Sequence, residues 1–222
     1  MFGRIAGRYD LANRTLSGGC DLWWRHRLVR EVTRLRPSLV VDLATGSGDV
    51  ALALRKKLPP ATRVLGLDFC EPMLEKARHK MPAVENLGPL SFEQGDILKL
   101  PLEDNSCDVV TIAFGLRNLA DRHRGLCEMR RILRPGGTLL ILEFTQPARW
   151  FRPIYYTYLR HVLPRLAGWI SGDRDAYEYL NNTIGAFPDK AGISAEMEKA
   201  GFRDVRAEGM TASIVALHQG VA

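Results

Sequence analysis

Two carboxylates and two glycines are spaced as a nucleotide-like ligand would require. Asp42 lies near the end of an apolar run, Gly46 and Gly48 follow it, and Asp68 ends the next apolar run. Because glycine has no Cβ, the backbone at these positions can approach a ligand closely. A helix that begins near Asp49 would turn its free N–H groups toward the same place. A carboxylate at a strand end can accept hydrogen bonds from both hydroxyls of a ribose.

Two cofactors suit this pattern. A nicotinamide dinucleotide requires G-x-G-x-x-G, and the third position is Ala51, which the looser form of the pattern permits. However, the loop offers no additional basic residue for a pyrophosphate. The spacing D-x-x-x-G-x-G from Asp42 resembles the S-adenosylmethionine-dependent methyltransferases, and Gly95–Asp96 stands where such enzymes hold the adenine amine. A dinucleotide, or a glycine turn without a ligand, stays open as an alternative.

The resemblance implies S-adenosylmethionine as the cofactor and no metal ion. It implies these cofactor-binding residues: Tyr9, Asp42, Gly46, Ser47, Gly48, Asp68, Phe69, Asp96, Ile97 and Ala113.

The stretch VVTIAFGLRNL (109–119) joins an apolar run to a guanidinium and an amide. Gly115 breaks the run, and Arg117 and Asn118 follow. In an open α/β sheet, ligands bind outside the carboxyl ends of the strands, so the pair is expected beside the cofactor site. The alternative is that the pair caps a turn or forms a structural ion pair.

Predicted strands and helices alternate through the first two thirds of the chain. Strands are expected over 39–44, 62–68, 90–96, 107–115 and 137–144, and helices over 49–58, 71–81 and 122–133. This alternation predicts a parallel sheet with helices on both faces, in a doubly wound order. After a helix over 194–202, the segments 203–210 and 211–220 alternate like an antiparallel hairpin. The expected fold is a Rossmann-like α/β sheet of seven strands, mostly parallel, with an antiparallel C-terminal hairpin.

The predicted organisation is a single domain over 1–222 with two additions to the sheet. Residues 1–36 are expected to form a helical lid, and 37–146 the cofactor-binding core. The segment 147–190 is expected to be a helical insertion, and 191–222 the closing helix and strands. The first part of the insertion, 147–172, is rich in aromatic residues and arginine and contains no acidic residue. Such a composition favours a prenyl-tail tunnel with a face for anionic lipid, or a homodimer interface.

The composition excludes several other classes of protein. With 222 residues, 46% hydrophobic and 25% charged, the chain can bury a core without disulfides. The four cysteines are therefore expected to be reduced, in a reducing compartment. The formal charge is +6, but no block of like charges supports a nucleic-acid partner. We expect no secretory signal and no membrane span, hence a cytoplasmic protein that at most contacts the inner face of the membrane.

Four separated motifs carry a more specific resemblance. YDLANRTLSGGCDLWW (9–24), AFGLRN (113–118), RILRPGGTLLILEFT (131–145) and ALHQG (216–220) occur in order and resemble the ubiquinone and menaquinone biosynthesis C-methyltransferases. The resemblance extends over nearly the whole chain and implies the class I fold of the S-adenosylmethionine-dependent methyltransferases. The chain departs from the family pattern at several positions. The departures closest to function are Asp21, where histidine is usual, and Ala113, where some relatives have a serine that contacts the cofactor.

The resemblance implies transfer of a methyl group to a ring carbon of a polyprenylated hydroquinone. Arg117 would favour a phenolate, and Asn118 would bind the same ring oxygen. Asp10 would orient Arg117 from the N-terminal helix, and Tyr179 would donate a hydrogen bond to the substrate. His218 is a candidate proton acceptor, because the pKa of imidazole lies near neutrality.

Two other functions stay open at this point. One is methylation of a phenol or sterol without a prenyl tail. The other is a non-catalytic quinone or lipid binder that keeps the fold. The residues do not distinguish a demethylmenaquinol from a ubiquinol precursor, and they do not decide the oligomeric state.

Overall fold

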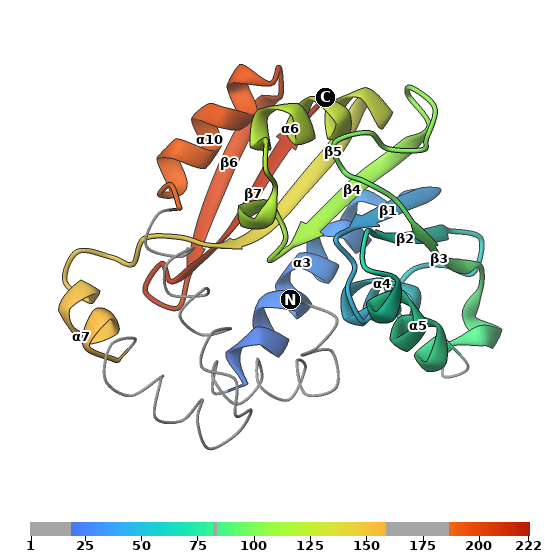
Figure 1. Cartoon of the computed structure of the whole chain (residues 1–222), viewed down its shortest axis with the longest axis horizontal. Coiled ribbons are helices and arrows are strands. Elements are labelled where there is room, and N and C mark those ends of the chain that lie inside the picture. The colour runs from blue at the N-terminus through green and yellow to red at the C-terminus, as the bar shows by residue number, and fades with distance from the viewer. Residues whose placement is uncertain (1–18, 82–83, 159–186) are drawn as a thin grey trace.

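A computed structural model describes residues 19–81, 84–158 and 187–222 (Figure 1). Within these ranges the strands are β1 Leu39–Leu43, β2 Arg63–Asp68, β3 Leu90–Gln94, β4 Cys107–Ala113, β5 Leu133–Phe144, β6 Arg203–Met210 and β7 Val215–Val221. The α-helices are α3 Cys20–Leu35, α4 Asp49–Arg55, α5 Glu71–Lys80, α6 Arg122–Ile132, α7 Arg152–Thr157 and α10 Lys190–Lys199. Two short 3-10 helices, η2 Glu85–Leu87 and η3 Leu116–Asn118, complete the elements.

The seven strands form one sheet in the order β3-β2-β1-β4-β5-β7-β6. Strands β1 to β5 pair in parallel, and β7 pairs antiparallel with both β5 and β6. The predicted mostly parallel sheet with an antiparallel C-terminal hairpin is confirmed. The strand order reverses between β1 and β4, so the loops that follow these two strands leave the sheet at its switch point, where open α/β sheets bind ligands.

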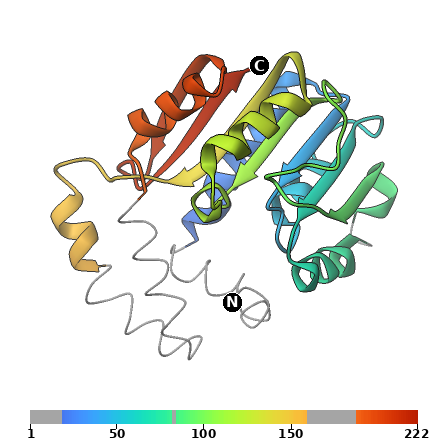
Figure 2. The ribbon, with the colours of Figure 1, turned by 45° about the horizontal axis from the view of Figure 1, so that its top comes forward.

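Helices cover both faces of the sheet. One apolar core lies between the sheet and α3, α4 and α5. The other lies between the sheet and α6 and α10, which lie side by side over the same face (Figure 2). The central strands alternate between the two cores: Val40 belongs to the first, and Val41 and Leu43 belong to the second. A strand buried on both faces reads as a continuous apolar run, which is why these strands were visible in the sequence.

Several element boundaries differ from the sequence prediction, some of them by three or four residues. The helix expected to reach residue 58 ends at Arg55, whose buried guanidinium donates hydrogen bonds to the carbonyls of Leu58, Pro59 and Thr62 and so holds a turn there. Strand β5 begins at Leu133 instead of 137. Helix α10 begins at Lys190 instead of 194, because the Asp189 carboxylate caps it by accepting a hydrogen bond from the Gly192 N–H at 2.9 Å.

The predicted insertion is described only up to residue 158 and from residue 187. Its described helix, α7, covers Arg152–Thr157 and stands apart from the sheet (Figure 1). None of the helices in the described ranges is both long enough and apolar enough to cross a membrane. All four cysteines are free thiols, as expected from the sequence.

Candidate active site

The loop after β1 adopts a backbone conformation that needs glycine. Ala44, Gly46 and Gly48 have φ angles of 49°, 56° and 81°, in the left-handed region. A Cβ on Gly48 would lie 2.7 Å from the Phe92 ring and 2.9 Å from the Ala77 Cβ. Gly48 is therefore required by close packing as well as by its φ angle. Its backbone leads directly into α4.

Asp42 holds this loop to the sheet. The side chain is buried, and its two oxygens accept hydrogen bonds of 2.6 Å from the hydroxyls of Thr45 and Thr111. Burial raises the pKa of Asp42 to about 6, because a charged carboxylate is poorly solvated there, and the two hydroxyls and the charge of Arg25 oppose that rise. Asp42 thus links the glycine loop to the neighbouring strand β4.

Asp68 connects the end of β2 to the same loop. Its Oδ2 accepts a hydrogen bond from the Gly46 N–H at 2.8 Å, and its Oδ1 accepts one from the Cys70 N–H at 2.9 Å. Burial raises the pKa of Asp68, and these backbone N–H groups oppose the rise. The next residue, Phe69, is 65% exposed. An exposed aromatic ring beside a carboxylate is an arrangement that suits a nucleoside, whose base can stack on the ring.

The end of β3 lies beside the end of β2. Gly95 donates a backbone hydrogen bond of 3.0 Å to the Asp68 carbonyl. Asp96 is exposed, and its Oδ1 accepts a hydrogen bond from the Leu98 N–H at 2.9 Å. Ile97 is buried in the core under α6. The three strand ends therefore form one continuous edge that carries Asp42, Asp68 and Asp96.

The short helix η3 packs directly against the glycine loop. A Cβ on Gly115 would lie 2.5 Å from the Ala44 Cβ, so the backbone after β4 touches the backbone after β1. Phe114, with a φ of 57°, turns the chain at this point. Such a conformation is unusual for an aromatic residue and is often found at functional sites. Arg117 and Asn118 follow this contact in the chain, within η3, and Ala113 is the last residue of β4.

Arg117 is held from three sides. Its Nη1 donates to the Phe114 carbonyl at 2.7 Å and to Glu143 Oε1 at 2.6 Å. The guanidinium also lies over the Phe144 ring, with 5.2 Å between Cζ and the ring centroid. The Arg117 side chain is only 6% exposed. The ion pair that the sequence left as an alternative thus exists. Arg117 nevertheless lies beside the cofactor edge, where the other interpretation placed it.

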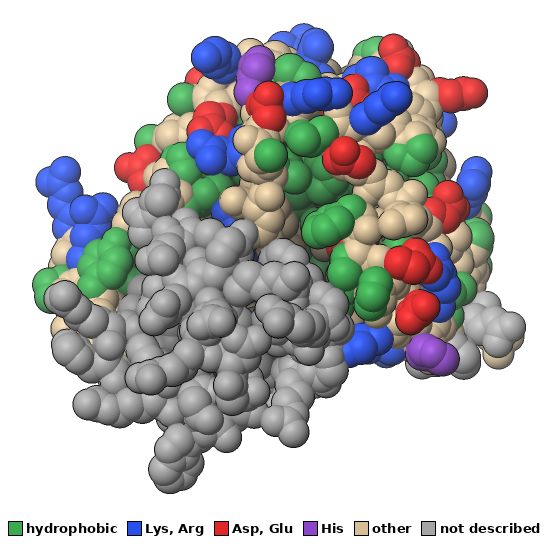
Figure 3. Space-filling model, viewed as in Figure 1, with side chains coloured by type: hydrophobic (Ala, Val, Ile, Leu, Met, Phe, Trp, Pro, Cys, Tyr) green, Lys and Arg blue, Asp and Glu red, His purple; other side chains and the backbone are tan. Residues whose placement is uncertain are grey.

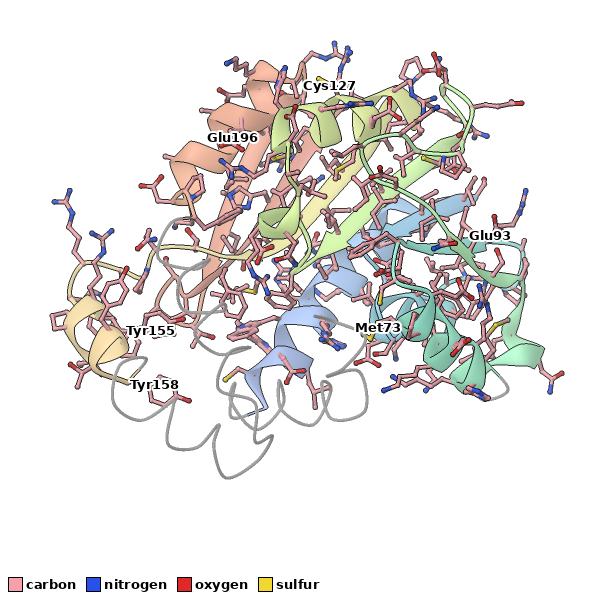
Figure 4. The ribbon with its side chains drawn as sticks, viewed as in Figure 1. Met73, Glu93, Cys127, Tyr155, Tyr158 and Glu196 are labelled. Atoms are coloured by element: carbon pink, nitrogen blue, oxygen red, sulfur yellow. The ribbon has the colours of Figure 1, made fainter. Side chains whose placement is uncertain are left out.

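An aromatic group lies next to Arg117. The ring centroids of Trp24, Phe114 and Phe144 are 5.0 to 6.3 Å from one another. The Trp24 Nε1–H donates a hydrogen bond to the Thr211 hydroxyl at 2.8 Å. On α7, burial raises the pKa of Tyr155, and the positive charge of Arg117 opposes that rise. Figure 4 shows Tyr155 on α7, away from the sheet.

One candidate from the sequence lies away from this edge. His218 is buried on the face covered by α10, where it pairs with Ile141 on the neighbouring strand and its Nε2 lies 3.2 Å from the Lys190 carbonyl oxygen. Burial lowers its pKa, which keeps the imidazole neutral near pH 7. Tyr9, Asp10 and Tyr179 lie outside the described residues. Ser47 is buried in the glycine loop, between Gly46 and Gly48.

The sequence reasoning did not single out Glu143, Phe114 or Phe144. Glu143 is the one acidic residue of the apolar strand β5, which was a usable signal, because an acid in a buried strand requires a partner. The aromatic residues could not be distinguished from ordinary core residues. Among the residues that the structure describes, no group of three or more His, Cys, Asp or Glu could hold a metal ion.

The fold is shared with solved methyltransferases. A S-adenosylmethionine-dependent methyltransferase from Aquifex aeolicus superposes with a TM-score of 0.60 at 20% identity and covers 83% of this chain and 81% of its own. One from Thermotoga maritima has a TM-score of 0.59 at 20% identity, with 99% and 97% covered. The chain therefore has the fold of the S-adenosylmethionine-dependent methyltransferases.

The sequence comparisons identify the family. The family model described as the ubiE/COQ5 methyltransferase family matches residues 1–222. A demethylmenaquinone methyltransferase of Thermus thermophilus is 47% identical over 99% of both chains. A ubiquinone/menaquinone biosynthesis C-methyltransferase of Syntrophotalea carbinolica is 44% identical over 99% of this chain and 92% of its own. The chain belongs to the ubiE/COQ5 methyltransferase family, as the four sequence motifs predicted.

Proposed function

We propose that this chain transfers the methyl group of S-adenosylmethionine to a ring carbon of a polyprenylated hydroquinone, either a demethylmenaquinol or a ubiquinol precursor. The observation that carries the proposal is the position of Arg117, a nearly buried guanidinium in η3, two residues after the Gly115 backbone that packs against the glycine loop at Ala44. The relatives' names supply the acceptor class.

The residues at the carboxyl edge fit an adenosyl group. Asp68 supplies a carboxylate for the ribose hydroxyls, and the exposed ring of Phe69 supplies a surface for adenine. In our proposal Gly46, Ser47 and Gly48 leave room for the methionine part, and Asp42 keeps their loop in place. Asp96, Ile97, Ala113 and Tyr9 complete the proposed set. The cofactor supplies an electrophilic methyl group, and the protein has to align the acceptor carbon with it.

Arg117 is proposed to act on the acceptor oxygen. A hydroquinone carbon becomes a better nucleophile when its neighbouring hydroxyl loses a proton, and a guanidinium favours the resulting phenolate. Asn118 would bind the same oxygen, and Asp10 and Tyr179 would add contacts from the lid and the insertion. We retain His218 as a proposed proton acceptor, but its imidazole faces α10, so the proton would have to reach it through intervening groups.

The test of this role compares two matched arginines. Arg117→Met is expected to lower turnover of a demethylquinol by about 10²-fold or more, with adenosylmethionine affinity changed less than about twofold. Arg122→Met is the control, because Arg122 also pairs with a glutamate, Glu196 at 2.8 Å, and lies 5.6 Å over a phenylalanine ring, Phe187. Equal losses in both variants would mean that Arg117 has only a structural role.

We also propose that the enzyme works in the cytoplasm at the membrane surface, where prenylated quinols reside. Trp150, which precedes α7, and Ile154, which lies in it, are 72% and 59% exposed, and Arg149 next to Trp150 is exposed as well. Figure 3 shows hydrophobic and basic side chains together over α7. Such a face suits anionic lipid. Sedimentation with anionic vesicles should capture the chain, and Trp150→Ser with Ile154→Ser should release it. A homodimer through 147–172 is the alternative, and vesicle-independent association would favour it.

A further inference from the structure

Glu143 makes contacts to both the backbone and the side chain of Arg117. Its Oε1 accepts from Arg117 Nη1 at 2.6 Å and from the Phe144 N–H at 2.8 Å. Its Oε2 accepts from the Arg117 N–H at 3.3 Å. The Glu143 side chain is 1% exposed. One carboxylate thus binds both the backbone N–H and the guanidinium of Arg117.

The rest of the arrangement leaves the guanidinium little freedom. Nη1 has two hydrogens, and both are used, one by Glu143 and one by the Phe114 carbonyl. Any further hydrogen bond from Arg117 must therefore come from Nε or Nη2. The Cζ atom of the guanidinium lies over the Phe144 ring. Because Glu143 stands on β5, paired with Ala216 in the interior of the sheet, its own position is fixed by the strand ladder.

We propose that Glu143 is a positioning residue for methyl transfer, which aims the Nε and Nη2 edge of Arg117 toward the acceptor oxygen. This inference rests on the proposed function of Arg117. The carboxylate also compensates the charge of a guanidinium that is nearly buried before an acceptor arrives, since an unpaired buried charge is strongly unfavourable. Glu143 itself does not contact the acceptor in this scheme.

A purely structural ion pair between β5 and η3 is the competing explanation. The two explanations differ in which constants change. A positioning residue acts only through Arg117, so its removal should lower kcat with KM and cofactor affinity nearly unchanged, and it should have no effect on turnover once Arg117 is gone. Loss of a purely structural pair should instead leave kcat unchanged, or change KM and adenosylmethionine affinity together with kcat, because such a pair holds β5 and η3 together and does not aim the guanidinium.

The experiment uses the full chain, S-adenosylmethionine and a demethylmenaquinol with a short prenyl tail. Glu143→Gln keeps the shape and removes the charge. In Glu143→Gln we expect kcat to fall about tenfold or more, while KM for the quinol and adenosylmethionine affinity change less than about threefold. In the Arg117→Met background, the same substitution is expected to change kcat less than about twofold. Glu196→Gln, which breaks the Arg122 pair, is the matched control and should leave kcat within about twofold.

Several results would overturn the inference: an unchanged kcat in Glu143→Gln, or an equal loss of kcat with and without Arg117. If Glu143→Gln does not fold, Glu143→Asp replaces it in the same cycle, because it keeps the charge and draws the carboxylate back by one methylene. Its kcat is then expected to fall only when Arg117 is present, and an undiminished kcat would overturn the inference.

An NMR readout separates this inference from the proposed function. Arginine side-chain ¹⁵N spectra report whether the Arg117 guanidinium is held, and Arg117→Met assigns its signal. We expect restricted rotation in the unmodified chain and fast rotation in Glu143→Gln, with the Arg122 signal unaffected. If the unmodified chain methylates no quinol, the proposed function fails, and the rotation experiment still decides whether Glu143 positions Arg117. Unchanged rotation would contradict the positioning role.

Discussion

Replacing Asp42 by asparagine should stabilise the protein, and only above a certain pH. Asp42 is buried, and its pKa is raised from 3.8 to about 6, chiefly by burial. Folding therefore favours the protonated form. Between about pH 4 and pH 6 the Asp42 carboxyl is still largely protonated in the folded protein, whereas it is already ionised in the unfolded chain. The contribution of Asp42 to the free energy of unfolding therefore falls as the pH rises through this range.

The size of the effect follows from the two pKa values. A difference of about 2.2 pKa units corresponds to about 3 kcal/mol at pH 8, where Asp42 is charged in both states. At pH 4 the same difference in pKa leaves less than about 1 kcal/mol. Asparagine can accept a hydrogen bond from one of Thr45 and Thr111 and donate one to the other, so the neighbouring hydroxyls keep their partners. The stability gained by removing the buried charge should therefore not be offset by lost hydrogen bonds.

The assay is urea unfolding of both chains at pH 4 and pH 8. The unfolding free energy of Asp42→Asn minus that of the unmodified chain should be about 2 kcal/mol more positive at pH 8 than at pH 4. Asp49→Asn is a control of opposite sign. Burial of Asp49 raises its pKa, but hydrogen bonding to Lys80 and the charge of Arg25 outweigh this, so the net pKa is lowered. That variant should lose stability at pH 8 and approach the unmodified chain in acid. A pH-independent difference for Asp42→Asn would refute the reasoning.

Three further predictions use the same methods. Phe69→Ala should weaken adenosylmethionine binding by about tenfold with almost no change in Tm, whereas Leu87→Ala, also exposed, should leave binding unchanged in calorimetry. Gly48→Ala should destabilise the protein by about 1–3 kcal/mol more than Gly19→Ala in urea. The two glycines have φ angles of 81° and 80°, but only the first has neighbours within 4 Å, so equal losses would show that strain alone matters. His218 should contribute a loss of stability as the pH falls below about 6.5, because its folded pKa is lowered. His218→Gln should remove that contribution, and an unchanged pH dependence of the unfolding free energy would contradict a depressed pKa.

The sequence was sufficient for the architecture and for the edge where the site lies. Strands buried on both faces appear as continuous apolar runs, and their ends carry Asp68 and Arg117, so the topology rules for parallel sheets brought these residues together. The ends of elements were predicted less well. Arg55 and Asp189 decide two of them through hydrogen bonds to carbonyls or N–H groups, and a residue type alone does not reveal such bonds.

What the sequence could not give depends on pairing between distant segments. The hydroxyl of Thr111 reaches Asp42 from 69 residues away, which makes the carboxylate a support for the loop. His218 was expected near the reaction, but its face is fixed by the register with Ile141 and by the helix α10 that covers it. Glu143 finds Arg117 only once β5 lies beside β4. Registers of this kind are set by the whole sheet.

The most direct test of the account is the fate of a labelled methyl group. The purified chain is incubated with S-adenosylmethionine that carries a ¹³C-methyl group and with a demethylmenaquinol, and the product is examined by mass spectrometry and ¹³C NMR. The account predicts one ¹³C-methyl on a ring carbon and one equivalent of S-adenosylhomocysteine, with little product from Arg117→Met and ordinary product from Arg122→Met. A methyl group on the ring oxygen, or no transfer despite cofactor binding, would contradict it.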